Sequence, residues 1–329
     1  MRVGIISFAH SHAFSYADAL KKIEGVELIG IADEQDSRGT QAAEKFGTTY
    51  YRQYEELLKQ DLDAVIITSE NSKHHEHTLA AARAGVHVLC EKPLAPSLED
   101  AQEMIDVCRE EGVILQTAFP VRFNTAVKRA KSIVESGGLG EIFAIKGTNR
   151  GTNPGGWFVD KELSGGGAVM DHTVHVADLM RWFLGSELKE VYAEIDQKFS
   201  DTDIDDCGLL TFEFENGVFA TLDCSWSRND TFPTWGDVTL EIIGSEGTLK
   251  VDAFAQKVDV YSPGGAAWDY WGDNMDAELV RDFLDSAANV SEPSVTGTDG
   301  MRAVEAALAA YESAAKKAPV TLQGRQAVR

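Results

Sequence analysis

A predicted helix combines acidic and imidazole side chains at helical spacing. Residues Ala168 to Leu184 have an amphipathic helical pattern that follows the glycine-rich run Ser164-Gly165-Gly166-Gly167. Asp171, His175 and Asp178 are spaced i, i+4 and i+7, which places them on one helix face. A carboxylate beside an imidazole, whose ordinary pKa is about 6.5, is a suitable pair for moving the proton of an alcohol. The alternative is a structural histidine with an aspartate in the first helical turn.

A lysine lies at the end of a predicted buried strand. Glu91-Lys92-Pro93 directly follows the apolar run Val86 to Cys90. Open α/β sheets place their ligands at the carboxyl ends of such strands. An ammonium group there can hydrogen-bond a substrate oxygen and stabilise its charge while C–O becomes C=O, or the reverse. A solvated lysine at a strand end is the alternative.

The first strand, turn and helix stand where a dinucleotide-binding domain carries G-x-G-x-x-G. No glycine occupies the fingerprint positions, and the turn reads Ser7, Phe8, Ala9, His10, Ser11 and His12. If this turn holds a pyrophosphate, its backbone N–H groups do so together with the Ser11 hydroxyl or an imidazole of His10 or His12. A purely structural turn is the alternative.

The end of the second predicted strand bears on cofactor choice. Asp33 stands where a carboxylate accepts hydrogen bonds from the ribose hydroxyls of NAD and repels the extra phosphate of NADP. Arg38, five residues further along the chain, is positively charged and can bind that phosphate. We therefore expect NAD(H) to be preferred and NADP(H) to be accommodated. A helix-capping aspartate is the alternative.

The elements that position these residues fall into two halves. From Arg2 to about Phe119, short β-branched runs alternate with helical patterns, as in a parallel sheet with crossover helices. Ser97 is placed to cap a helix that Gly112 ends. After residue 120, strands follow one another through tight turns at Asn216-Gly217 and Gly244 to Gly247, which favours antiparallel pairing.

The sequence therefore predicts an α/β fold with two domains. Residues 1–120 form a Rossmann-type dinucleotide-binding domain, and residues 121–329 form an α+β domain with an open, mostly antiparallel sheet. We expect the second domain to bind substrate and to form oligomers. The alternation of Phe212, Phe214, Phe219 and Trp226 with polar residues predicts an uncovered apolar sheet face that joins a homodimer or homotetramer.

Composition excludes other classes of protein. The 329 residues are 43% hydrophobic and 25% charged, a mixture that folds, and the net charge of -23 repels nucleic acid and anionic membrane surfaces. The four cysteines form no CxxC pair, and no apolar run reaches the roughly 18 residues of a spanning helix. We expect free thiols, no signal segment and a cytoplasmic protein.

Together these segments resemble the Gfo/Idh/MocA family of NAD(P)-dependent oxidoreductases, which includes glucose-fructose oxidoreductase and inositol dehydrogenases. The resemblance covers nearly the whole chain. It rests on the order and spacing of EKP at Glu91, the preceding TSENSKHHEHTLAAARAGVHV, RFN at Arg122, SGGLGEI at Ser136, SGGGAVMDHTVHVAD at Ser164 and GSEGTL at Gly244.

The resemblance implies hydride transfer between nicotinamide and a secondary alcohol of a sugar, polyol or related carbohydrate, bound between the two domains. It implies that Lys92, Asp171 and His175 are catalytic. The implied cofactor residues include Thr68, Asn71, His74, Glu91 and Lys92, and the implied substrate residues are Lys92, Arg122, Trp157, Asp171, His172 and His175. The chain departs from the family at the first turn, where the glycines are missing.

Two other functions fit part of the sequence. His10-Ser11-His12 resembles the metal-binding HxH of hydrolase barrels, but the strand-to-strand succession after residue 190 does not fit eight strand–helix units. A non-catalytic sensor of nucleotides or sugars would explain the missing glycines. It would not need the proton-transfer pair of Asp171 and His175. Because the hydrolase barrel does not fit the sequence, we expect no metal.

Overall fold

The chain forms two compact units, each built from several stretches of sequence. The computed structural model describes residues 1–322. Unit 1 comprises residues 1–123, 162–165 and 274–304, and unit 2 comprises residues 124–161, 166–273 and the described residues from 305 on. The division therefore differs from a single boundary at residue 120, because residues 274–304 pack with the N-terminal stretch.

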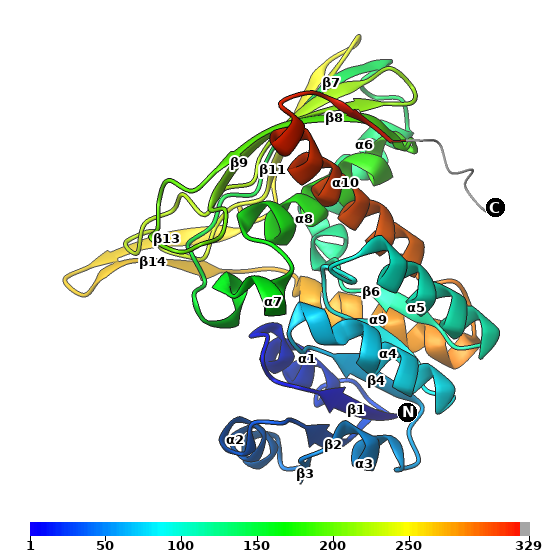
Figure 1. Cartoon of the computed structure of the whole chain (residues 1–329). Coiled ribbons are helices and arrows are strands. Elements are labelled where there is room, and N and C mark those ends of the chain that lie inside the picture. The colour runs from blue at the N-terminus through cyan, green and yellow to red at the C-terminus, as the bar shows by residue number, and fades with distance from the viewer. Residues whose placement is uncertain (323–329) are drawn as a thin grey trace. The chain divides into compact units, whose positions relative to one another are not determined.

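Unit 1 contains a six-stranded parallel sheet (Figure 1). Its order is β3-β2-β1-β4-β5-β6, the order of a dinucleotide-binding Rossmann fold. Its central strands are buried on both faces, as their continuous apolar runs predict. The strands are β1 (Arg2–Ile6), β2 (Glu27–Ala32), β3 (Thr49–Tyr51), β4 (Ala64–Ile67), β5 (His87–Cys90) and β6 (Leu115–Thr117).

Local capping explains one end each of two connecting helices of unit 1. The Ser97 hydroxyl accepts a hydrogen bond from the Asp100 N–H at 3.1 Å and caps α5, and Gly47 ends α2 with a left-handed φ of 62°. The helices are α1 (His12–Leu20), α2 (Asp36–Phe46), α3 (Tyr54–Leu58), η1 (Asn71–Lys73), α4 (His74–Arg83), α5 (Leu98–Glu110), η2 (Pro120–Phe123), α7 (Lys161–Ser164), α9 (Met275–Asn289) and the first part of α10 (Gly297–Lys316).

Unit 2 contains a seven-stranded sheet in the order β12-β11-β7-β10-β9-β8-β15. It is mostly antiparallel, as expected, with one parallel pair between β7 and β10. The strands are β7 (Ile142–Thr148), β8 (Leu188–Asp196), β9 (Cys207–Phe214), β10 (Phe219–Asp223), β11 (Thr239–Gly244), β12 (Thr248–Asp252) and β15 (Val320–Thr321). Helices α6 (Thr125–Glu135), α8 (Ala168–Leu184), the rest of α10 and the short η3 (Gly156–Val159) complete the unit.

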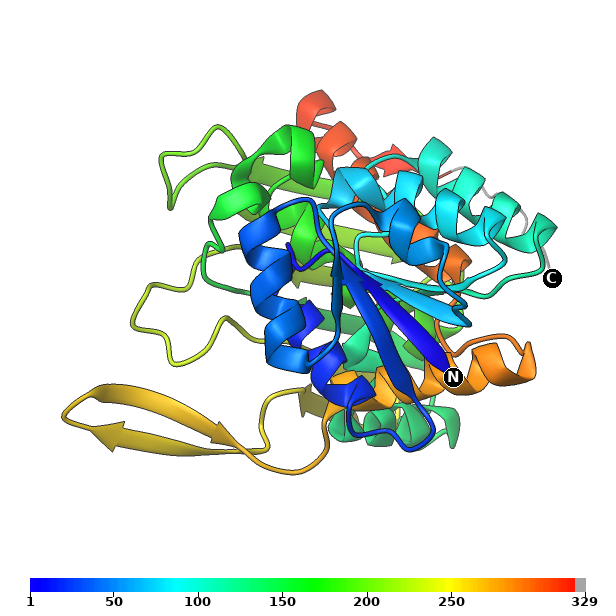
Figure 2. The ribbon, with the colours of Figure 1, turned by 90° about the horizontal axis from the view of Figure 1, so that it is seen from below.

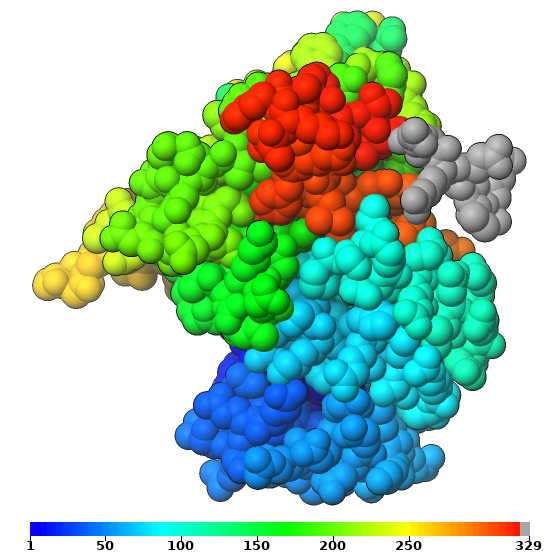
Figure 3. Space-filling model, viewed as in Figure 1, coloured from blue at the N-terminus to red at the C-terminus, as the bar shows by residue number. Residues whose placement is uncertain are grey.

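A separate hairpin extends from unit 2. Strands β13 (Lys257–Ser262) and β14 (Gly265–Tyr270) pair only with each other in the described residues, and Figure 2 shows them side by side beyond the rest of their unit. The space-filling view shows the same arm standing out from the surface of its unit (Figure 3). Neither this hairpin nor β3 and α3 were predicted from the sequence, because none of them carries a long run of buried apolar residues.

Candidate functional site

The first turn of unit 1 adopts the backbone shape of a glycine turn without a glycine. Ser7 has a φ of 72°, in the left-handed region that usually requires glycine. The Ser7 carbonyl accepts a hydrogen bond from the Thr68 hydroxyl at 2.7 Å, and the His10 N–H donates to the Thr68 carbonyl at 3.0 Å. Thr68 at the end of β4 thus holds the turn that precedes α1.

Asp33 is the hydrogen-bond acceptor that anchors this turn. Its buried carboxylate accepts from the Phe8 N–H at 2.7 Å and from the Gln35 N–H at 2.8 Å. The Arg38 guanidinium meets the same carboxylate with two bonds, of 2.8 Å from Nε and 2.9 Å from Nη2. The ion pair therefore ties the end of β2 to α2 and fixes the direction of Arg38.

A cavity of about 440 Å³ opens beside this pair within unit 1. Ser7, Asp33, Arg38 and Ser69 are among its lining residues. Two carboxyl ends of parallel strands, β2 and β4, meet here, which is where a Rossmann domain binds the adenosine part of its cofactor. The left-handed turn at Ser7 and this cavity fit a bound dinucleotide.

The two histidines of the turn gather around Glu91. The fully buried Glu91 carboxylate faces His12 Nδ1 at 2.9 Å and accepts a hydrogen bond of 2.5 Å from the Tyr16 hydroxyl. The His10 Nδ1 accepts from the His12 N–H at 3.1 Å. One ligand atom from each of His10, His12 and Glu91 lies within 4.8 Å of the others, close enough for a metal ion.

The electrostatics of this cluster favour the charged forms of Glu91 and His12. Burial alone would raise the pKa of Glu91, but His10, His12 and Lys92 hold that pKa well below its usual range. Burial alone would lower the pKa of His12, whereas the adjoining Glu91 carboxylate raises it overall. The cluster is thus an ion-paired network in which carboxylate and imidazolium stabilise each other.

Lys92 lies directly after β5, and His74 holds the residue that follows it. Its side chain is buried, at 5% exposure. His74, fully buried at the start of α4, has Nδ1 2.9 Å from the Pro93 carbonyl and Nε2 3.1 Å from the Ser69 carbonyl. Burial lowers the pKa of His74, which favours the neutral ring. His74 therefore braces the lysine segment from the interior.

Two further predicted residues of unit 1 make structural contacts. The Asn71 amide donates to the Ser164 carbonyl at 2.8 Å, so it joins η1 to the end of α7. Arg122 is buried, donates from Nη1 to the Ser294 carbonyl at 2.9 Å and pairs through Nη2 with Asp299 at 3.2 Å. These contacts fix the Arg122 side chain within unit 1.

In unit 2 a remote carboxylate caps the helix that carries Asp171 and His175. Asp205 accepts from the Gly167 N–H at 3.0 Å and from the Val169 N–H at 2.8 Å. The Tyr311 hydroxyl donates to Asp205 at 2.8 Å. A Cβ at Gly167 would lie 1.9 Å from the Asp205 carbonyl oxygen, so the glycine run permits this close approach. The start of α8 is therefore firmly fixed.

Asp171 is oriented by residues from α8 and from the loop after β10. The Trp226 indole N–H donates to Asp171 Oδ2 at 3.3 Å, and His172 Nε2 lies 3.3 Å from the same oxygen. His175 follows one turn later on α8 and is buried, as is Asp178. The predicted helix bounds are confirmed, and the imidazole that the structure brings to Asp171 is that of His172.

Trp157 belongs to η3, shortly before α7. Its indole stacks on the Phe158 ring, with centroids 3.9 Å apart. Phe158 packs in turn against the buried cluster around Trp226. Trp157 is half-buried. Through Phe158 it is connected to Trp226, which donates a hydrogen bond to Asp171.

Sequence reasoning missed three residues that hold the site. Tyr16, which binds Glu91, stands four residues after His12 in the same helix, and this spacing could have indicated it. Asp205 and Tyr311 carry no local signal, because they meet the start of α8 from 36 or more residues away in sequence.

Comparisons with known proteins identify the class of protein. The model described as "Oxidoreductase family, NAD-binding Rossmann fold" matches residues 1–119, and the "GFO/IDH/MocA C-terminal domain" model matches residues 127–250. The chain is thus an oxidoreductase with an NAD-binding domain. It belongs to the Gfo/Idh/MocA family.

Relatives align over most of their length. Myo-inositol 2-dehydrogenase of Thermotoga maritima is 29% identical over 98% of this chain and 99% of its own. D-glucoside 3-dehydrogenase of Escherichia coli is 33% identical over 70% of this chain and 71% of its own. The structure of GenD2 from gentamicin A biosynthesis, in complex with NAD, superimposes with a TM-score of 0.91 at 25% identity, covering 98% of this chain and 97% of that one.

Within residues 1–322 no helix is both long and apolar enough to cross a bilayer.

Proposed function

We propose that this oxidoreductase oxidises a secondary alcohol of a sugar or polyol with NAD, or catalyses the reverse reduction. The observation that carries the proposal is Lys92, buried directly beyond a strand of the NAD-binding domain and braced by His74. The relatives named inositol and glucoside dehydrogenases support this substrate class. The acidic and imidazole groups on α8 supply the proton-transfer chemistry that such a reaction needs.

The proposed reaction divides the work among three side chains. Lys92 donates a hydrogen bond to the alcohol oxygen and stabilises its negative charge as the C–H bond breaks. His175 takes the hydroxyl proton, and Asp171 stabilises the resulting imidazolium. Bound NAD would supply the hydride acceptor, C4 of its nicotinamide. The products are a ketone or lactone, NADH and one proton, and reduction runs the same steps backward.

Neighbouring residues orient the reactants in this proposal. Trp157 offers an apolar ring face to the sugar, and His172 contacts it beside Asp171. Glu91 and Asn71 lie on the cofactor side with the residues of the first turn, Ser7 to His12. His74 also belongs to the cofactor side, and Arg122, held by Ser294 and Asp299, belongs to the substrate side.

A panel of sugars and polyols tests this function. Each compound is incubated with the protein and either NAD or NADP, and nicotinamide absorbance is followed. We expect reduction of NAD with at least one sugar or polyol. If NADH binds, as seen in a fluorescence titration, but no compound is turned over, the protein is a sensor and the proposal is wrong.

We expect that chelators leave activity unchanged. Our reason is that the cluster is held by protein hydrogen bonds, since Glu91 accepts from Tyr16, His12 and the Lys92 N–H, and His10 Nδ1 accepts from the His12 N–H. We propose instead that His10 and His12 contact the cofactor. His10→Ala or His12→Ala should then raise the KM for NAD, whereas His87→Ala, at a site away from the turn, should not. Loss of activity with a chelator and its return with zinc would support a metal enzyme.

The uncovered sheet face differs from the apolar face predicted. Phe212, Phe214 and Trp226 are buried, and Phe219 is exposed. The reason is the register of β9 and β10. Phe219 pairs with Glu213, so these two residues share one face of the sheet and Phe212 lies on the other. Helix α8 packs against β7 and β9.

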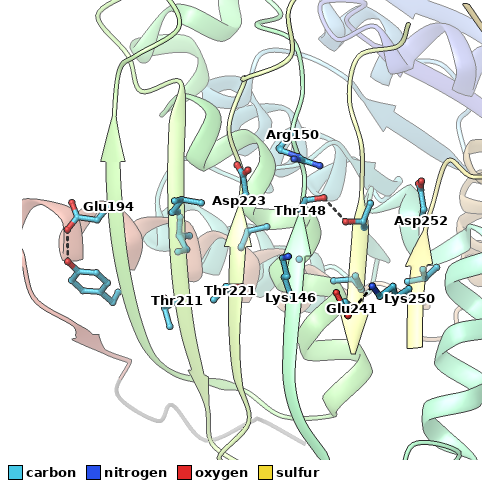
Figure 4. Close-up of a pocket in the computed structure, with 18 of the residues that line it drawn as sticks. Lys146, Thr148, Arg150, Glu194, Thr211, Thr221, Asp223, Glu241, Lys250 and Asp252 are labelled. Carbon is cyan, nitrogen blue, oxygen red and sulfur yellow. Dashed lines mark hydrogen bonds and ion pairs between the residues drawn. The ribbon is translucent and has the colours of Figure 1, made fainter. Parts of the chain in front are cut away.

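The residues on the uncovered face are mainly polar, with scattered apolar side chains (Figure 4). They line a broad concavity of about 950 Å³. Among them Leu209 is 65% exposed, and Lys146, Glu241 and Lys250 provide charges of both signs. Leu209, Phe219 and Ile243 also put exposed apolar side chains on this face, and a second copy of the sheet would bury them.

We propose a homodimer or homotetramer joined through this face. Leu209→Glu should shift the protein toward monomer in sedimentation velocity at micromolar concentration. Phe199→Glu, a change at a similarly exposed apolar residue in a loop, should leave the assembly intact. A monomeric wild-type protein would rule this assembly out.

The cytoplasm is the compartment that we propose for this protein. Its four cysteines are all free thiols, three of them buried, as expected in a reducing environment.

A further inference from the structure

Five aromatic rings of unit 2 form a continuous chain of contacts that begins at His172. We call Trp235, Phe254, Tyr270, Trp268 and Phe232 the aromatic track. Successive ring centroids are 6.1 Å apart for His172 and Trp235, 5.5 Å for Trp235 and Phe254, 6.1 Å for Phe254 and Tyr270, 6.3 Å for Tyr270 and Trp268, and 5.2 Å for Trp268 and Phe232.

The track joins three separate segments. Phe232 and Trp235 come from the loop between β10 and β11, Phe254 follows β12, and Trp268 and Tyr270 share one face of β14. Segments this far apart in sequence align their rings without building a core, since Trp235 and Tyr270 each remain 45% exposed. A row of large aromatic rings on the surface indicates a binding function.

The contacts within the track are edge-to-face, and Trp235 and Tyr270 are the rings of the track that stay most exposed. The four pairs within the track meet at interplanar angles between 68° and 88°, so the edge of one ring meets the face of the next. Rings in this arrangement cannot all cover one another. Half-exposed Trp and Tyr faces suit the C–H faces of a sugar ring.

Charged side chains are interleaved with the rings. The Lys257 ammonium lies 4.1 Å from the Trp268 ring centroid and pairs with Asp259, which stands opposite Trp268 in the hairpin. The Arg228 guanidinium lies 4.2 Å from the Phe232 centroid. The centre of a protein interface is depleted of such charges. Aromatic faces bordered by hydrogen-bonding groups fit a ligand that has both apolar faces and many hydroxyls.

We propose that the aromatic track is a second sugar subsite. It holds a sugar unit joined by a glycosidic bond to the unit that is oxidised, so the substrate class is a disaccharide or longer glycoside. This inference rests on the proposed function, because the track begins at His172, which that function places beside the oxidised sugar. The hairpin β13–β14 supplies the part of the subsite farthest from His172.

Binding measurements test the subsite independently of turnover. Glucose, cellobiose and maltose are titrated against the full-length protein while tryptophan fluorescence and heat are recorded. We expect at least one disaccharide to bind about 10-fold or more tightly than glucose, on the scale of one added aromatic contact. Tyr270→Ala should reduce this ratio toward one, and Tyr270→Phe, which keeps the ring, should preserve it.

The matched control lies on the same hairpin. Tyr261 is 81% exposed beside the turn of the hairpin and belongs to no ring contact of the track, so Tyr261→Ala should keep the wild-type ratio. Equal affinity for glucose and both disaccharides, absence of sugar binding, or an unchanged ratio in Tyr270→Ala each overturns the proposal. Reduction of NAD, followed in parallel, reports separately on the proposed oxidoreductase activity.

Discussion

Lys92→Ala should lower turnover by about 100-fold or more while NADH binding changes little. The expected loss is on the scale of removing one oxyanion donor, because the proposed role of Lys92 is to stabilise the charge that develops on the substrate oxygen. In our proposal the first turn and the cavity beside Asp33 hold the cofactor, and this change leaves both in place. Turnover is measured with the best sugar from the panel, and NADH affinity by fluorescence.

A lysine elsewhere in the same unit provides the control. Lys59 is exposed at the end of α3 and does not line the cavity beside Asp33, so Lys59→Ala removes the same charge without removing the proposed oxyanion donor. It should retain turnover within a few-fold of wild type. Near-normal turnover in Lys92→Ala, with a folded protein, would remove Lys92 from the mechanism.

Asp33→Ser should convert an NAD preference into a preference for NADP. In the structure both oxygens of Asp33 hold the Arg38 guanidinium, at 2.8 and 2.9 Å. Removing this carboxylate abolishes its repulsion of the 2'-phosphate and frees Arg38 to bind that phosphate. A charge-assisted hydrogen bond of this kind is worth up to a few kcal/mol, so the ratio of specificity constants should shift by about 100-fold.

The double variant Asp33→Ser/Arg38→Ala separates the two contributions. It lacks both the repulsion and the guanidinium, so it should lose most of the gain with NADP that the single variant shows. Thermal unfolding should accompany both measurements, because Asp33 also anchors the Phe8 and Gln35 N–H groups. A wild-type enzyme that prefers NADP would defeat this prediction.

Local patterns in the sequence predicted the elements that carry the site. The bounds of α8, the cap at Ser97 and the two classes of sheet follow from periodicity and turn residues. The sequence could not show that Ser7 takes a left-handed φ, because the Asp33 and Thr68 hydrogen bonds that support it come from distant strands. For the same reason, the sequence could not show that Asp205 caps the start of α8.

Alternation along a strand predicts which residues share a face, but it does not carry across a turn. Phe212 and Phe219 belong to adjacent strands, and the pairing of Phe219 with Glu213 places them on opposite faces. The hairpin β13–β14 was missed for a related reason. Its side chains are mostly exposed on both faces, so no hydrophobic period marks it.

Direct hydride transfer from a sugar carbon to NAD is the central claim. A substrate identified in the panel is prepared with deuterium at the carbon that is oxidised, and the reduced cofactor from a single turnover is examined by mass spectrometry and NMR. We predict one deuterium per NADH, located at C4 of the nicotinamide, and a slower reaction in Lys92→Ala. NADH that carries no deuterium, or oxidised sugar without reduced cofactor, would contradict this function.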